Sequence, residues 1–130
     1  QENVSLIPFS PLAGGVLSGK YLDKQRPEGA RFTKYLAMGG RQAAMAGRFI
    51  NDKTLASTAR FMEIAQQAGL APVTLATAWS KQHDFVASTI VGATRVDQLD
   101  DIFAAAEVVL SAEVMAEIDK VTTEIRYPMG

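Results

Sequence analysis

Two short apolar runs interrupt an otherwise mixed sequence, and each one predicts a buried strand. Residues 4–9 (VSLIPF) are followed by Ser10-Pro11, and residues 85–91 (FVASTIV) lie between an aspartate and a glycine. Short apolar runs that are bounded by turn residues and rich in β-branched side chains are typical of strands. Because Pro8 lacks a backbone N–H, we expect the end of the first strand to pair poorly.

Four further segments carry the cap residues and the apolar spacing of helices. Asn51 is placed to cap a helix that stops at Gly69, and Pro72 suits the first turn of the next helix. Residues 94–97 (TRVD) have the form of a capping box, and Ser111 precedes a last helix. The positions expected on the inward faces of these helices are Leu55, Thr58, Met62, Ala65 and Ala68, then Leu75, Ala76 and Trp79, then Val96, Leu99, Phe103 and Ala106, and finally Val114, Ile118, Val121 and Ile125.

The remaining segments are predicted to be irregular. Residues 10–21 (SPLAGGVLSGKY) form a Gly-rich turn that leads into a short helix over residues 16–21, whereas residues 22–47 lose all periodicity. A loop of that length is usually a functional flap or disordered. The order of strand, loop and two helices, repeated twice, favours an α/β layer with parallel strands. Two parallel strands leave edges and faces uncovered, so we expect the sheet to be incomplete.

Composition and charge exclude several classes of protein. The chain has 130 residues, of which 48% are hydrophobic and 21% charged, with a net charge of -1 and no cysteine. This balance argues against nucleic-acid and anionic membrane partners, and no apolar run approaches the ~20 residues of a membrane span. The lack of cysteine excludes thiol catalysis and fits a reducing cytoplasm. The opening QENV has no basic, apolar leader and no initiating Met, so we expect no export signal and a piece of a longer chain.

The loop after the first predicted strand contains residues 14–21 (GGVLSGKY), which fit the pattern G-x-x-x-x-G-K. Tyr21 stands where a P-loop needs Ser or Thr to hold magnesium. Three interpretations stay open at this point. The segment is a P-loop, a Gly-rich connector with a solvated Lys20, or a looser anion site in which backbone N–H groups and Lys20 face a phosphate.

The loop after the second predicted strand, residues 91–95 (VGATR), precedes the predicted capping box. A helix N-terminus carries unpaired N–H groups and attracts phosphate, Gly92 permits close approach, and Arg95 is suited to clamp an anion. Ordinary helix capping is the alternative interpretation. Two such loops, each after a strand, fit the phosphate site that (β/α)8 barrels build after strands seven and eight.

No catalytic constellation is visible in the sequence. His83 is the only histidine and stands in a polar KQHD cluster, where we expect a surface side chain rather than a general base. No second histidine or close pair of carboxylates predicts a metal site, and the tyrosines have no neighbouring base. We therefore expect no catalytic residue and no metal ligand in this chain.

Several motifs resemble those of the aldo-keto reductase family. IPFSPLAGGVLSGKY resembles the strand-seven signature of that family, STIVGATRVDQLDDI its strand-eight signature, and GLAPVTLATAW the pattern between them. The terminal LSAEVMAEID and RYP resemble the branch that includes potassium-channel β-subunits and bacterial relatives. The resemblance implies an α/β fold in which residues 1–130 form a single partial domain. That domain is the C-terminal part of a (β/α)8 TIM barrel, comprising the last two strands with their helices.

The resemblance also implies roles in binding the cofactor. Phe9 stands where an aromatic ring stacks on nicotinamide, and three basic residues stand at phosphate positions, which favours NADPH over NADH. Ile102 replaces the amide residue expected near adenine. The implied cofactor-binding residues are Phe9, Ser10, Pro11, Leu12, Gly14, Lys20, Arg31, Gly92, Thr94, Arg95, Gln98 and Asp101.

In the family, hydride passes from NADPH to a carbonyl, and the catalytic tetrad of Asp, Tyr, Lys and His lies on earlier strands. None of the tetrad is expected here. The resemblance thus implies the NADP(H) cradle of a cytoplasmic oxidoreductase, inactive alone. Its partners are a small-molecule carbonyl substrate and the missing N-terminal part of the barrel. The alternative is a non-catalytic half-barrel that binds nucleotide or another protein.

Overall fold

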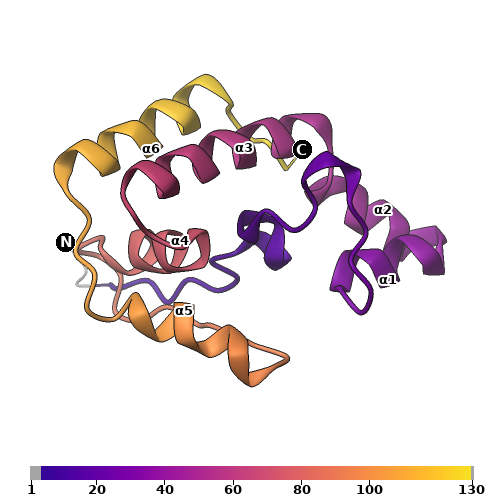
Figure 1. Ribbon diagram of the computed structural model, residues 1–130, viewed down its shortest axis with the longest axis horizontal. Helices are drawn as coiled ribbons and strands as arrows, with labels where there is room; N and C mark the ends of the chain where they lie inside the picture. Colours follow the sequence, from indigo (N-terminus) through magenta and orange to yellow (C-terminus); the bar gives the residue numbers. More distant parts are fainter. Residues whose placement is uncertain (1–3, 130) are drawn as a thin grey trace.

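The computed structural model describes residues 4–129, and that part of the chain is mainly helical (Figure 1). Helices α3, α4, α5 and α6 gather on one side, and α1 and α2 form a hairpin on the other. The α-helices are α1 (Arg31–Met38), α2 (Gly40–Phe49), α3 (Asp52–Gln67), α4 (Pro72–Lys81), α5 (Leu99–Ala104) and α6 (Ala112–Glu124), and the 3₁₀ helices are η1 (Ala13–Ser18), η2 (Leu22–Lys24) and η3 (Val96–Gln98).

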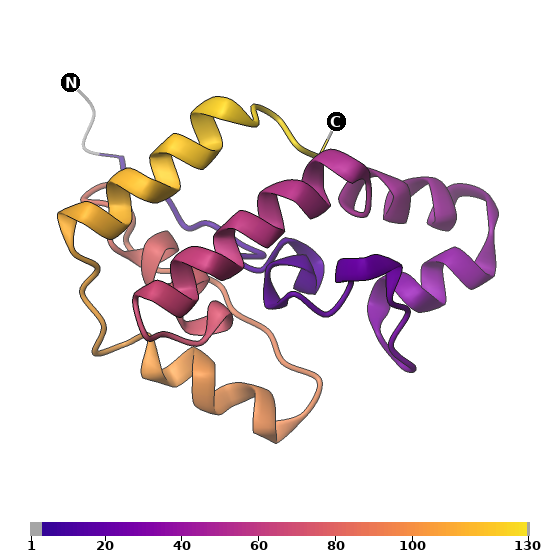
Figure 2. The same ribbon diagram turned by 45° about the horizontal axis from the view of Figure 1, so that its top comes forward.

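Two groups of buried side chains hold these helices together. In the larger group α3 packs between α4 and α6, and α5 packs on α4 (Figure 2). The smaller group joins η1 to the α1–α2 hairpin through Val16, Tyr21, Phe32 and Ala46. The buried residues of the larger group are Phe61, Ile64, Ala65, Leu75, Ala76, Ala78, Ala105, Leu110, Ile118 and Val121.

The predicted starts of three helices are confirmed. The Asn51 side chain accepts a hydrogen bond from the N–H of Thr54 at 3.0 Å, and the Ser111 hydroxyl accepts one from the N–H of Val114 at 3.3 Å. Pro72 is the first residue of α4. A cap of this type stabilises a helix by about 1 kcal/mol, and because the donor lies only three residues away, the sequence alone identifies it.

The predicted loop over residues 22–47 is wrong, because most of it folds into α1 and α2. The rings of Phe32 and Phe49 stack with centroids 5.0 Å apart, which ties the two helices together. Gly39, with φ 72°, ends α1 and leads directly into α2. Helices of 8 and 10 residues have weak propensity in isolation, so tertiary packing rather than a long apolar period stabilises them.

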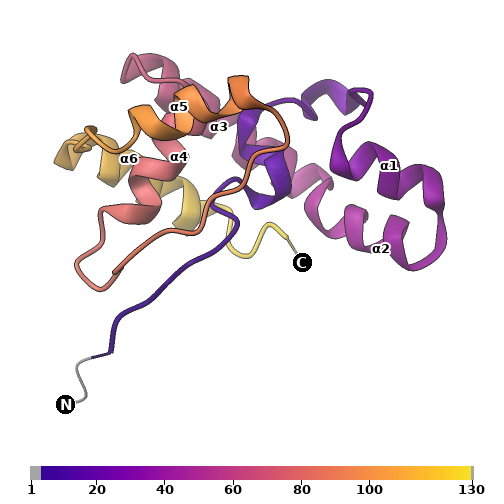
Figure 3. The ribbon, with the colours of Figure 1, turned by 90° about the horizontal axis from the view of Figure 1, so that it is seen from below.

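The two predicted regular strands are also wrong for residues 4–129, where only isolated bridges pair the segments. Leu6 pairs with Val86 and Phe9 with Ile90, both in parallel orientation, so the predicted direction of pairing agrees with the structure (Figure 3). The second segment carries one more residue between the two bridges than the first, which breaks a continuous ladder. The carbonyl of Pro8 accepts a hydrogen bond from the N–H of Ile90 at 2.8 Å, but Pro8 has no N–H with which to donate a bond to the other segment.

Two further local predictions are wrong. The short helix expected over residues 16–21 is instead η1, which begins at Ala13 and contains non-helical glycines. The single helix predicted to follow the capping box of residues 94–97 is instead the 3₁₀ turn η3 followed by α5. Because a 3₁₀ turn advances fewer residues per turn, the inward face rotates, so Ile102 is buried whereas Phe103 is 63% exposed.

Candidate functional site

The parallel bridges determine which loops are neighbours. Phe9 pairs with Ile90, so both segments leave this bridge in the same direction. In a parallel pair the carboxyl ends lie at the same edge. The Gly-rich loop that starts at Ser10 and the loop that contains Gly92 therefore begin side by side, as the sequence predicted.

The Gly-rich loop is tightly folded. The N–H of Ala13 donates to the carbonyl of Ser10, and the N–H of Gly15 to that of Leu12, both at 2.9 Å. Gly14 (φ 68°) and Gly15 (φ 96°) adopt left-handed backbone. A Cβ atom on Gly14 would lie 2.5 Å from Cζ of Phe32. The glycine therefore lets the loop lie against a buried aromatic ring.

Lys20 is the central cation of the site. Its side chain crosses Gly15, where an added Cβ would meet Lys20 Cε and Nζ at 2.8 Å, and Nζ lies 5.4 Å from the ring centre of Tyr21. Partial burial lowers the pKa of Lys20, and the charges of Arg31 and Arg95 lower it further. Arg31 and Arg95, which come from two other segments, thus each lie within electrostatic reach of Lys20.

Tyr21 belongs to the interior rather than to a metal site. Its side chain is fully buried, and its hydroxyl oxygen accepts a hydrogen bond from the N–H of Phe32 at 3.1 Å. A P-loop places a short hydroxyl side chain toward magnesium at this position. The buried Tyr21 argues against the P-loop interpretation. The contact could not be predicted from the sequence, because nothing in the local pattern links Tyr21 to α1.

The second loop is ordered by its own side chains. The N–H of Thr94 donates to Oε1 of Gln98 at 2.9 Å, which is not the contact that the capping box predicted. Arg95 donates from Nε to Oδ1 of Asp97 at 2.9 Å and forms an ion pair with the same carboxylate. The hydrogen bond to Asp97 is the main cause that raises the pKa of Arg95, and the bond from Arg95 is the main cause that lowers that of Asp97. Asp97 was interpreted as a helix cap, but it is the partner of Arg95.

The other predicted residues surround these cations to different degrees. Phe9 is 78% exposed, so its ring is open to solvent. Pro11 and Leu12 are half-buried, and Leu12 packs against the larger core group. Ser10 and Gly92 are exposed. Asp101 faces solvent on α5, and only its backbone carbonyl has a described partner, the hydroxyl of Thr74 at 2.8 Å.

His83 lies away from the two loops, between aromatic rings. It stacks on Phe85 with ring centres 5.2 Å apart and meets Trp79 edge to face at 4.9 Å. It is therefore half-buried rather than on the surface as predicted. Within residues 4–129 no three His, Asp or Glu side chains are placed to hold a metal ion.

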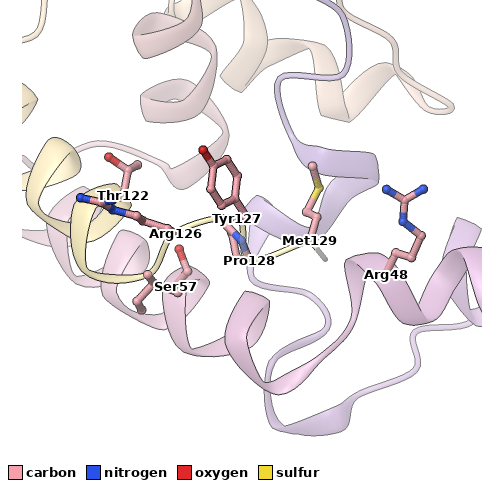
Figure 4. A pocket seen from close by; sticks show the side chains of 8 residues that line it. Arg48, Ser57, Thr122, Arg126, Tyr127, Pro128 and Met129 are labelled. Atoms are coloured by element: carbon pink, nitrogen blue, oxygen red, sulfur yellow. The ribbon is translucent and has the colours of Figure 1, made fainter.

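One hollow is separate from the predicted site. It has a volume of about 640 Å³ and lies between α3, the end of α6 and the C-terminal tail (Figure 4). Its lining contains none of the predicted cofactor-binding residues. The tail beside it is held by hydrogen bonds from Asn51 and Thr54 to the carbonyl of Pro128. No helix in the described part of the chain is long and apolar enough to cross a membrane.

Comparison with known proteins gives one consistent family. Residues 1–123 match the aldo/keto reductase family. The protein tas of Escherichia coli K12 is 36% identical over 98% of this chain, and a putative voltage-gated potassium channel subunit beta of Schizosaccharomyces pombe is 32% identical over 92%. An L-glyceraldehyde 3-phosphate reductase of Escherichia coli O157:H7 is 33% identical over 92% of the chain. The chain spans 34%, 35% and 34% of these relatives, respectively. The match over nearly the whole chain shows that it belongs to the aldo/keto reductase family.

Proposed function

We propose that this chain supplies the NADP(H)-binding part of an aldo-keto reductase that reduces a small-molecule carbonyl. The observation that carries the proposal is the position of Lys20 against the Gly-rich loop, within electrostatic reach of Arg31 and Arg95, whose charges add to burial in lowering the pKa of Lys20. Lys20 and Arg31 form no ion pair with the described residues, and like charges without an acidic partner favour an anionic ligand. A 2′-phosphate with two negative charges relieves this repulsion, which favours NADPH over NADH.

The other residues of the site fit the same cofactor. The exposed ring of Phe9 is available to stack on a flat nicotinamide. The turn from Ser10 to Gly14 and the loop from Gly92 to Gln98 lie at one edge of the paired segments, where they would hold the pyrophosphate and the adenosine side. When bound, NADPH supplies the hydride, and this chain binds and orients it. The catalytic tetrad lies outside these residues, on the earlier strands of a whole barrel.

We further propose that residues 1–130 form one partial domain, the last two strand positions of a (β/α)8 barrel with their helices. Apolar side chains of both paired segments are uncovered, which supports a missing layer of neighbours. Their exposed fractions are 54% for Leu6, 60% for Ile7 and 55% for Ile90. The N-terminal part of a barrel is the partner that would cover them, in a cytoplasmic enzyme.

A titration of NADPH and NADH into the purified chain tests this function, with circular dichroism as the check of folding. We expect saturable binding with a preference for NADPH. Arg95→Glu should reduce NADPH affinity far more than NADH affinity, because it reverses a charge at the 2′-phosphate. Equal losses for both cofactors would reject the assignment, and so would a folded chain that binds neither.

The exposed apolar face also favours a second candidate, a half-barrel that binds nucleotide or another protein without turnover. In that case two copies would cover their open faces by pairing. Analytical ultracentrifugation distinguishes the candidates. A stable stoichiometric dimer supports the half-barrel, whereas a monomer that gains activity with an N-terminal barrel part supports the reductase.

A further inference from the structure

The cations Lys20 and Arg31 are brought together by a buried side chain that neither composition nor motif assigns to the site. Lys20 precedes Tyr21 in the chain, and Arg31 precedes Phe32. Tyr21 and Phe32 are joined by a hydrogen bond of 3.1 Å from the N–H of Phe32 to the Tyr21 hydroxyl. Each end of this contact therefore lies next to one of the two cations.

The hydroxyl of Tyr21 serves as the cap of α1. Ala30, the residue before the helix, has no side-chain oxygen to accept from the first backbone N–H groups. Those groups have no partner within a helix and require one from outside. Tyr21 supplies it at Phe32, the second residue of α1. The place where α1 begins, and so the backbone of Arg31, is tied to Tyr21.

The ring of Tyr21 holds the other cation. The Nζ atom of Lys20 lies 5.4 Å from its ring centre, within the range of a cation–π contact. The ring also meets Phe32, with centres 5.8 Å apart. Tyr21 is fully buried, so these contacts have little freedom to move.

Arg31 is unusual for a helix start. It is the first residue of α1, and no acidic residue occupies the first turn. The helix dipole disfavours a cation there and favours an anion. Lys20 adds a second positive charge whose pKa is lowered partly by Arg31. Two cations within electrostatic reach, one of them at the positive end of a helix, are stabilised when an anion lies between them.

Resting on the function proposed above, we propose that Tyr21 is a positioning residue whose hydroxyl holds the start of α1, so that Arg31 and Lys20 meet the same 2′-phosphate. Tyr21 touches neither cofactor nor substrate. It acts through the two residues that its hydroxyl and its ring hold in place.

Tyr21→Phe tests this role because it removes the hydroxyl and keeps the ring beside Lys20. The probes are adenosine 2′,5′-bisphosphate and adenosine 5′-monophosphate, which differ only in the 2′-phosphate. We expect Tyr21→Phe to bind the bisphosphate roughly two- to tenfold more weakly, the range of one lost hydrogen bond, and the monophosphate within about twofold of the original chain. A purely structural defect would weaken both probes alike.

Tyr35→Phe is the matched control. Tyr35 meets the same Phe32 ring, with centres 6.0 Å apart, and its hydroxyl makes no hydrogen bond with the described residues. Tyr35→Phe removes a phenol oxygen from the same aromatic group without removing the cap of α1. We expect the preference of this variant for the bisphosphate to equal that of the original chain. An equal loss in both variants would overturn the role of Tyr21.

A second measurement does not depend on nucleotide binding. The pKa of the Lys20 ammonium group is followed by NMR in the original chain, Tyr21→Phe and Arg31→Ala. We expect it to rise in both variants, because Arg31 is displaced in one and absent in the other. If the original chain does not prefer the bisphosphate over the monophosphate, the proposed function fails. A raised Lys20 pKa in Tyr21→Phe would then still support the positioning role of Tyr21. If the chain prefers the bisphosphate but Tyr21→Phe changes neither preference nor pKa, the positioning role fails alone.

Discussion

Replacing Gly14 by alanine should destabilise the chain through one identifiable contact. The residue has φ 68°, a left-handed conformation that costs an L-residue about 1–2 kcal/mol. The new Cβ would lie 2.5 Å from Cζ and 2.7 Å from Cε2 of Phe32. That ring is 1% exposed and stacks on Phe49, so it has no free space into which it can move. Overpacking of a buried site costs about 1–3 kcal/mol more.

We therefore expect Gly14→Ala to lower the free energy of unfolding by about 2–5 kcal/mol, the sum of backbone strain and overpacking. The assay is urea unfolding followed by far-ultraviolet circular dichroism, with the midpoint and slope analysed together. Gly29→Ala is the matched control, because Gly29 has φ 74° but no atom within 4 Å of the added Cβ. It should lose only the strain, about 1–2 kcal/mol.

The difference between the two alanine variants isolates the clash with Phe32. If both lose the same stability, the ring moves aside freely and the packing argument is refuted. The double variant Gly14→Ala with Phe32→Leu provides a further check, because the smaller side chain removes the aromatic atoms that Cβ would meet. Its loss should be smaller than the sum of the two single losses, as expected for residues in contact.

Three further predictions concern charge and caps. Asp97→Asn removes the ion-pair partner of Arg95 and should strengthen NADPH binding without changing NADH binding, as measured by titration; unchanged NADPH affinity would show that the pair does not compete with phosphate. Burial, and then the charges of Arg31 and Arg95, lower the pKa of Lys20 in the folded chain. Below that folded-state pKa the positive charge of Lys20 therefore opposes folding. This destabilisation disappears as the pH rises toward the ordinary pKa of 10.5. Lys20→Met should therefore raise the urea midpoint at neutral pH and lose that advantage above pH 10.5; a constant advantage would contradict the charge argument. Asn51→Ala should cost about 1–2 kcal/mol in urea unfolding, since it removes the cap of α3 and a bond to the Pro128 carbonyl. A loss no larger than that of Ser111→Ala, which removes a cap alone, would show that the bond to the tail adds nothing.

Local chemistry made part of the fold predictable. Asn51 and Ser111 cap their helices through donors three residues away, so the sequence itself contains both partners. The α1–α2 hairpin could not be predicted from the sequence, because its stability comes from the contact of Phe32 with Phe49 across a turn. The two apolar runs predict regular strands because their side chains are suited to packing against neighbouring elements on several sides. Within residues 4–129 only two isolated bridges pair them.

The candidate site divides in the same way. Basic residues at motif positions could be identified one by one, and Arg31 and Arg95 each lie within electrostatic reach of Lys20. Their partners could not be identified, because Tyr21 reaches α1 through tertiary contact alone. Asp97 was visible, but its spacing from Thr94 fits a capping box as well as an ion pair with Arg95. Only geometry distinguishes the two.

The three cations are not equivalent in the free chain, and this difference bears on how an anion would bind. Arg95 is exposed and already forms an ion pair with Asp97, so phosphate must compete with this carboxylate. Lys20 and Arg31 form no ion pair with the described residues, and the helix dipole adds to their repulsion. A phosphate therefore gains most from Lys20 and Arg31 and recruits Arg95 by exchange with Asp97. Affinity for the 2′-phosphate should therefore depend chiefly on the two cations held by Tyr21, and the exchange between Arg95 and Asp97 should adjust it.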